Sequence, residues 1–337
     1  MLSGKLLPAH PHPLPNELLS SWLTRLAQAN GIKLHSLALD LWDRKTALAA
    51  WARDIDRSIS NQQLLKITER TGVSENAIRD TTLASFEGTL TETIYKNTHD
   101  PFILPCGIKH RTKTKNWLVY CPKCLAEDKV PYYRLTWRLA IFTVCPKHKT
   151  AMLDQCPICK APINFVRGEL GQRFVTFFDS LCNCVNCGFN LTFAKTYQPE
   201  FPNHKVQINY LSLLNQLKYK SLSYESLHFK NGYELFIFII HLSCFLQSKR
   251  GNELLKRSQL ITKPTNQMVF SNPTKNTFSE INLNDRHELL MLSLWLLNDW
   301  PKRFECLYKK SKISRTKFLG DGNLPVWIDS FLKRIDN

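Results

Sequence analysis

Four short motifs rich in cysteine follow one another in the middle of the sequence. They read CPKC at residues 121–124, CPKH at 145–148, CPIC at 156–159 and CVNC at 184–187. Two metal-binding side chains with two residues between them can hold one Zn²⁺ from a single tight turn, and two such turns complete a tetrahedron. Proline after the first cysteine favours this turn, and Gly188 relieves the last one. The spacing therefore predicts two zinc sites within residues 121–187.

We expect neighbouring motifs to pair, so that the first two form site one and the last two form site two. The predicted ligands are Cys121, Cys124, Cys145 and His148 at site one, and Cys156, Cys159, Cys184 and Cys187 at site two. The loops 125–144 and 160–183 between paired motifs have lengths typical of zinc ribbons. Two alternatives stay open. Cys182 can supply a ligand in another register, or the first motif can pair with the third and the second with the fourth.

Both ligand sets predict structural rather than catalytic zinc. A catalytic zinc keeps an open position and usually has histidine and carboxylate ligands, whereas each set here has four ligands dominated by cysteine. The HExxH motif and the deaminase pairing of HxE with PCxxC are absent from the sequence. We therefore expect two structural Zn²⁺ ions that contribute to folding, and no enzymatic activity.

The cysteine count argues against a disulfide framework. The chain has 11 cysteines, an odd number, and prolines at positions 8, 11, 13 and 15 interrupt any apolar core of a secretory signal. The longest apolar run, residues 235–246, is shorter than the roughly 20 residues that a membrane helix needs. These features predict a soluble cytoplasmic protein.

The charge of the chain is unevenly distributed. Its 337 residues carry a formal net charge of +17, but residues 1–100 are neutral, so the basic excess lies in residues 101–200 and 201–337. Such an excess favours a nucleic acid as partner, although a basic surface can also serve solubility alone. The candidate phosphate-binding residues are Lys109, Arg111, Lys113, Lys115, Lys309, Lys310 and Lys312.

The first hundred residues read as a helical domain that contains a helix-turn-helix. A first helix is expected to start near residues 15–17, with Asn16 as its N-cap. The helix-turn-helix spans 61–84: a helix over 61–71, a turn at Gly72, and a second helix capped by Ser74 that runs to about Leu83. The predicted exposed residues of the second helix are Glu75, Asn76, Arg79 and Asp80. Their charges sum to −1, which favours contact with a protein over base reading.

Hydrophobic patterning completes the expected fold. A β-hairpin is expected over 165–178, and helices over 207–218, 233–247, 285–298, after Pro301, and over 325–334. Trp137, between the two motifs of site one, either packs in a small core or contacts nucleic acid. We expect a mainly α fold with small β content, in three domains: a helical domain (1–100), a tandem zinc module (101–200) and a helical C-terminal domain (201–337).

Several of these segments together resemble the TniQ/TnsD family of transposon target-selection proteins. The resemblance lies in the stretches PLPNELLSSWLTRLA (13–27), VYCPKCL (119–125), YYRLTW (132–137), VCPKH (144–148) and LNDWPKRF (297–304). It extends over nearly the whole chain, and the order of the segments is more specific than any one of them.

The resemblance implies a bacterial, nucleoid-associated adaptor without catalytic activity. Family members of this compact type bind a type I CRISPR effector (Cascade) that carries a guide RNA, form a homodimer, and recruit the AAA+ ATPase TnsC and through it the transposase. Longer TnsD-like members instead read an attachment site on DNA directly, which is the alternative function implied for this chain.

Overall fold

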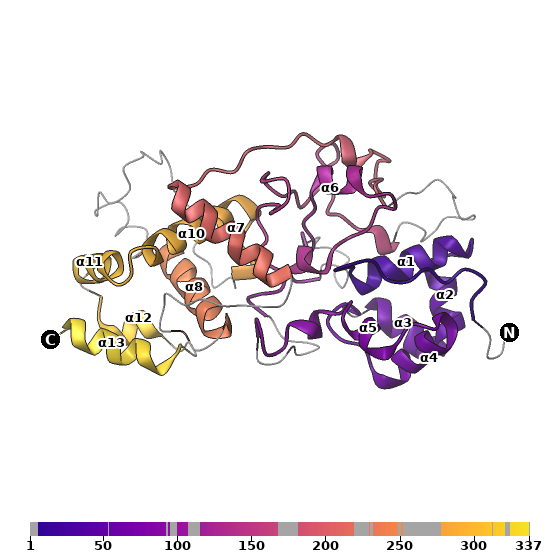
Figure 1. The fold of residues 1–337 in the computed structure, drawn as a ribbon, viewed down its shortest axis with the longest axis horizontal. Coiled ribbons are helices and arrows are strands. Elements are labelled where there is room, and N and C mark those ends of the chain that lie inside the picture. Colours follow the sequence, from indigo (N-terminus) through magenta and orange to yellow (C-terminus); the bar gives the residue numbers. More distant parts are fainter. Residues whose placement is uncertain are drawn as a thin grey trace. The chain divides into compact units, whose positions relative to one another are not determined.

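The structure is a computed structural model of the chain. It describes residues 6–52, 54–91, 94, 100–106, 115–167, 181–218, 229, 232–248, 251, 278–311, 313–320 and 324–336. Helices dominate these ranges (Figure 1). Pairs of residues in isolated β-bridges account for the small β content. The predicted fold class, mainly α with little β, is confirmed at this level. None of the helices in these ranges is long and apolar enough to cross a membrane.

The chain folds into two compact units. Unit 1 comprises residues 1–87 and 93–199, and unit 2 comprises residues 88–92 and 200–337. The helical part and the cysteine-rich part of the sequence thus pack into one unit. The three-domain division at residues 100 and 200 stays a prediction.

Five helices form the first part of unit 1: α1 (Leu19–Ala29), α2 (Leu34–Leu41), α3 (Arg44–Ala52), α4 (Asn61–Thr71) and α5 (Glu75–Arg79). Helix α1 is central, and even its polar residues Ser20 and Ser21 are buried. Its apolar face packs with residues from α2, α3, α4 and α5 in one core. That core contains Trp22, Leu26, Leu37, Leu64 and Ile78, each fully buried.

The start of α1 differs from the prediction. The helix begins at Leu19 rather than near residues 15–17, and its N-cap is Leu18. Asn16 instead adopts a left-handed conformation with φ 58°. Its side-chain amide donates to Thr136 Oγ1 at 2.8 Å, and its backbone carbonyl accepts a hydrogen bond from the backbone N–H of Leu135. Asn16 therefore ties the entry segment to a distant part of the chain instead of capping a helix.

The α4–turn–α5 segment agrees with the prediction in its first half. Helix α4 has the predicted bounds, Gly72 ends it with φ 71°, and the Ser74 side chain caps α5. The second helix, however, ends at Arg79 and not at Leu83. The hydroxyls of Thr81 and Thr82 bond back to the carbonyls of Ile78 and Arg79, which favours a turn over a further helical turn. Whether this pair of helices acts as a helix-turn-helix stays a prediction.

The second part of unit 1 has little regular structure. Its short elements are α6 (Pro122–Glu127) and the 3₁₀ turns η1 (Leu83–Phe86), η3 (Leu135–Arg138), η4 (Phe165–Arg167) and η5 (Leu191–Phe193). Trp137 is buried and meets the ring of Tyr133 edge-on at 5.9 Å, so it belongs to a small core. Of the expected hairpin over 165–178, only residues 165–167 are described, and they form η4.

Unit 2 is helical where it is described. Its helices are α7 (His204–Lys218), α8 (Gly232–Gln247), α10 (Leu283–Leu297), α11 (Lys302–Ser311), α12 (Arg315–Leu319) and α13 (Val326–Asp336), with a 3₁₀ turn η6 (Phe278–Glu280). Five of them coincide with the expected helices within a few residues, whereas α12 was not expected. Fully buried Phe238 of α8 and Phe304 of α11 lie edge to face, 6.0 Å apart. An aromatic core therefore holds this unit together.

Candidate metal centre

Each motif of site one is a tight turn that directly follows a residue paired in an isolated β-bridge. Tyr120 pairs with Leu153, and the chain then turns at Cys121 into α6, whose first residue is Pro122. Cys124 lies one turn into that helix. The predicted role of the proline is thus visible: it occupies the first helical position, where a missing N–H is tolerated.

The second, third and fourth motifs share one backbone conformation. The residue after each fourth position has a positive φ: 54° at Lys149, 59° at Lys160 and 74° at Gly188. Its amide donates to the carbonyl of the first cysteine in each motif, at 2.7, 3.0 and 2.7 Å. The sequence pointed to this feature only at Gly188, because lysine rarely adopts that conformation. For Lys149 and Lys160, the available signal was their position, because each directly follows the second ligand of its motif, as Gly188 does.

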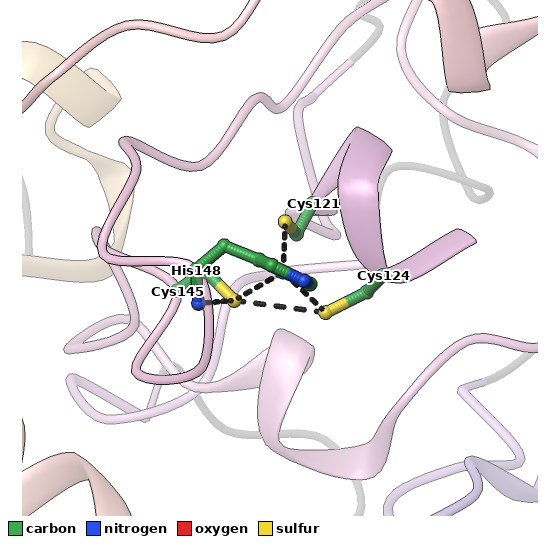
Figure 2. A group of neighbouring side chains, drawn as sticks. All are labelled: Cys121, Cys124, Cys145 and His148. Atoms are coloured by element: carbon green, nitrogen blue, oxygen red, sulfur yellow. Dashed lines mark hydrogen bonds between the residues drawn. The ribbon is translucent and has the colours of Figure 1, made fainter. Parts of the chain in front are cut away.

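Site one gathers its four side chains around a common centre (Figure 2). The Nδ1 atom of His148 lies 3.4 Å from the sulfur of Cys121, 3.3 Å from that of Cys124 and 3.5 Å from that of Cys145. The Cys124 and Cys145 sulfurs are 3.6 Å apart. Ligands at Zn–S of about 2.3 Å and Zn–N of about 2.0 Å in a tetrahedron lie roughly 3.5–3.8 Å from one another. The donor set fits a tetrahedral ion.

Site two meets the same geometric test with four sulfurs. Cys156 and Cys187 are 3.7 Å apart, and Cys159 and Cys184 are 3.6 Å apart. Cys156 and Cys184 are buried, whereas Cys187 is exposed. In each site all ligand atoms lie within 4.8 Å of one another. Both groups can therefore hold a metal ion.

The structure pairs the first motif with the second and the third with the fourth. It places Cys184 in site two and leaves Cys182 outside, with its thiol directed to the Leu125 carbonyl at 3.9 Å. This is the preferred pairing from the sequence, and the cross-braced arrangement does not occur. The eight predicted ligands fall into the two predicted groups, while the identity of the ions stays a prediction.

Comparison with known proteins relates part of the chain to a protein family. Residues 8–152 match the family model described as TniQ. The chain contains a TniQ domain. The resemblance predicted from the sequence is thereby confirmed over these residues, and no curated protein matches the chain. The similarity of residues 297–304 lies outside the matched span and stays a prediction.

The TniQ match indicates the general process in which the chain takes part. TniQ is a non-catalytic accessory family of transposition, so the domain implies a role as an adaptor or in target selection. The matched span includes the helices α1–α5 and all of site one, but it ends before Cys156. Site one therefore lies within the matched residues, whereas site two lies after them.

A buried charged cluster anchors the loop of site one within the TniQ domain. Arg138 is fully buried and donates to Asp54 at 2.6 and 3.0 Å, to Asp56 at 3.1 Å and to the Leu104 carbonyl. Burial raises the pKa of Asp56 to about 6, although the positive charge of Arg138 opposes that shift. Burial also disfavours the charge of Arg138, but the two aspartates prevail and raise its pKa. The sequence did not reveal this cluster.

The predicted contact residues of α5 lie at the surface of the domain. Asn76, Arg79 and Asp80 are exposed and Glu75 is half-buried. Arg79 donates to Asn61 Oδ1 at 2.7 Å, so its position is fixed relative to the start of α4. Contact of these residues with a partner stays a prediction.

The predicted phosphate-binding residues are described only in part. Lys115 in unit 1 is half-buried, and Lys309 and Lys310 in α11 are exposed. Lys109, Arg111, Lys113 and Lys312 lie outside the described residues.

Proposed function

We propose that this chain is an adaptor that links a type I CRISPR effector (Cascade) and its guide RNA to the AAA+ regulator TnsC. Through TnsC it would bring the transposase to a target chosen by the guide RNA. The observation that carries the proposal is the TniQ domain over residues 8–152. The remaining features support proposals on how such an adaptor would be stabilised and which surfaces would face its partners.

We also propose that both metal groups hold structural Zn²⁺. Cysteine thiolates with at most one histidine are the ligands that structural zinc prefers, and a complete set of four leaves no position for a substrate. The spacing of the sulfur and nitrogen atoms in both groups supports this assignment. Bound zinc would cross-link chain segments that have little regular secondary structure of their own.

Two kinds of surface would serve the partners of the adaptor. The exposed part of α5, in a net-neutral stretch of sequence, suits contact with a protein. The basic residues Lys115, Lys309 and Lys310 suit a position beside RNA or DNA, because residues 101–337 carry the whole basic excess. A homodimer would present each surface twice.

Co-purification with the effector complex tests the adaptor function. We expect the full chain to be retained by an effector that carries guide RNA, and TnsC to be retained only when the chain is present. Arg79→Glu should reduce retention without loss of fold, whereas the matched control Arg44→Glu, at an exposed arginine of α3, should not. Absence of any association, with or without guide RNA, contradicts the proposal. Equal retention of the two variants removes α5 from the contact surface.

The net charge of +17 favours one alternative function, direct selection of an attachment site on DNA. A titration of the full chain with DNA at several salt concentrations distinguishes the two. A direct DNA reader binds its own site at least about 10³-fold more tightly than random DNA. Equal affinity for native and random DNA excludes this alternative.

A further inference from the structure

One acidic side chain lies directly behind the histidine of site one. The two ring nitrogens of His148 have different partners: Nδ1 faces the three sulfurs, and Nε2 lies 2.8 Å from Glu127 Oε1. Glu127 is the last residue of α6, the helix that also supplies Cys124. A single short helix therefore carries both a ligand of site one and the partner of another ligand.

The hydrogen bond decides which ring nitrogen is available to a metal ion. A carboxylate only accepts hydrogen bonds, so the Nε2 atom beside it must carry the proton. In neutral imidazole the other nitrogen, Nδ1, then has a free lone pair, and this is the atom that points at the sulfurs. Carboxylate partners of metal-bound histidines fix the ring in this way and make it a better ligand.

The second oxygen of Glu127 is also engaged. Lys147, the residue before His148, forms an ion pair with Glu127 Oε2. That lysine is 66% exposed, and its ammonium group can only donate hydrogen bonds, so it can orient the carboxylate but cannot accept the ring proton in its place. Glu127 itself is 48% exposed. Because water competes for an exposed carboxylate, its effect on the ligand should lie at the low end of what such partners contribute.

We propose that Glu127 is the positioning residue of site one, which holds His148 in the Nε2–H form so that Nδ1 binds the metal ion. The inference rests on the assignment of zinc to site one. It goes beyond that assignment because it names a residue that raises the zinc affinity of site one and does not act on site two. Site two contains no histidine, so its four thiolates have no need of such a partner.

Zinc competition with a chromogenic chelator on the full-length chain tests this role. Glu127→Ala should lower the zinc affinity of one of the two sites by about tenfold, within the 10- to 100-fold range known for such partners. Glu127→Gln keeps an oxygen acceptor and should lose less. The matched control Glu69→Ala removes a similarly exposed glutamate that pairs with Lys66 and should change neither site.

Nitrogen-15 NMR of labelled histidine shows which site is affected, because His148 is the one histidine among the eight ligands. In the zinc-loaded wild-type chain we expect a protonated Nε2 and a metal-bound Nδ1. In Glu127→Ala this signal should become a mixture of ring states. Unchanged zinc affinity in Glu127→Ala overturns the proposal, and so does an equal loss in Lys147→Ala. A wild-type chain that holds no zinc at site one overturns both this proposal and the zinc assignment, whereas a loaded site insensitive to Glu127 overturns this proposal alone.

Discussion

The two compact units of this chain are stabilised by different means. In its described residues, the second part of unit 1 has β-bridges and short helical elements of three to six residues, and both candidate metal-binding groups lie within it. Unit 2, where it is described, is built from helices of up to 16 residues around aromatic rings such as Phe238 and Phe304, which meet edge to face. Within the part of unit 2 that the structure describes, no cluster of His, Cys, Asp or Glu can hold a metal ion.

This difference shows what each kind of sequence needs in order to fold. Helices bury a wide apolar face and satisfy their own backbone groups, so unit 2 can rely on burial of residues such as Phe238 and Phe304. Short turns bury less and leave more of the backbone to be fixed by other means, so ions bound at the two sites would replace part of that stabilisation. The two units should therefore lose stability under different perturbations: unit 1 on loss of metal, and unit 2 on disturbance of its core.

The largest effect should come from loss of a zinc ligand. Cys121→Ser should reduce the zinc content from two ions per chain to one and unfold the region around site one, because structural zinc contributes about 10–16 kcal/mol of apparent binding free energy. Elemental analysis and hydrogen exchange followed by mass spectrometry measure both outcomes. Exchange should rise within residues 115–199 and stay unchanged in α8 and α10.

The remaining cysteines offer matched variants for this experiment. Cys187→Ser should give the same loss of one ion at site two, whereas Cys306→Ser, at a half-buried cysteine of unit 2 outside both groups, should retain two. Two zinc ions in Cys121→Ser would show that the ligand set is wrong. Faster exchange in α8 or α10 would show that the stability of unit 2 depends on the metal after all.

A smaller effect, still confined to unit 1, should follow from removal of its buried charge. Arg138→Leu removes the cation that bonds to buried Asp56 and leaves Asp54 with the longer ion pair to Arg57, at 3.5 Å. Loss of one partner from such a cluster costs about 3–5 kcal/mol. Urea unfolding of the zinc-loaded chain, monitored by exchange in unit 1, measures this loss. Lys66→Ala is the control within the same unit. It breaks an exposed ion pair and should change the free energy of unfolding by less than about 1 kcal/mol.

Arg138 also illustrates what the sequence could not reveal. Its partner Asp54 lies 84 positions earlier in the chain, and nothing in the residues around either of them points to the other. Asn16 is a related case. Its local sequence is typical of a helix N-cap, but contacts with Leu135 and Thr136, about 120 positions away, determine its conformation. Non-local contacts of this kind override local propensity.

The metal ligands and the long helices could be predicted because their signals are local. Two ligands three positions apart must lie on one turn, whatever the rest of the fold, so the four ligand pairs follow from spacing. Spacing left open which pairs share an ion and whether Cys182 takes part, and the folded structure decides both. The bounds of α4 likewise follow from Ser60 and Gly72 at its ends. Glu127 is intermediate: it follows Cys124 by three positions, but its bond to His148 spans 21 positions and needs the folded site.

The smallest expected effect is a response of unit 2 to acid. His241 of α8 is half-buried, its Nε2 atom lies 2.7 Å from the Phe318 carbonyl, and its ring meets that of Phe318 edge-on. Burial lowers the pKa of His241 below 6.5, although the bond to the Phe318 carbonyl opposes the shift. His287 of α10, bonded to the Glu200 carbonyl, has a pKa lowered for the same reason.

The direction of the effect follows from proton uptake. As the pH falls below 6.5, His241 and His287 bind protons in the unfolded chain before they do in the folded unit, so the free energy of unfolding decreases. His241→Gln keeps a side-chain donor near Phe318 but cannot titrate, and it should remove part of this decrease. Exchange in α8 and α10, corrected for intrinsic rates and compared at about pH 5.5 and about pH 7.5, measures it separately from acid release of zinc in unit 1. An equal decrease in the variant and the wild-type chain would assign the acid sensitivity to other groups, and the contrast between the units would then rest on metal and buried charge alone.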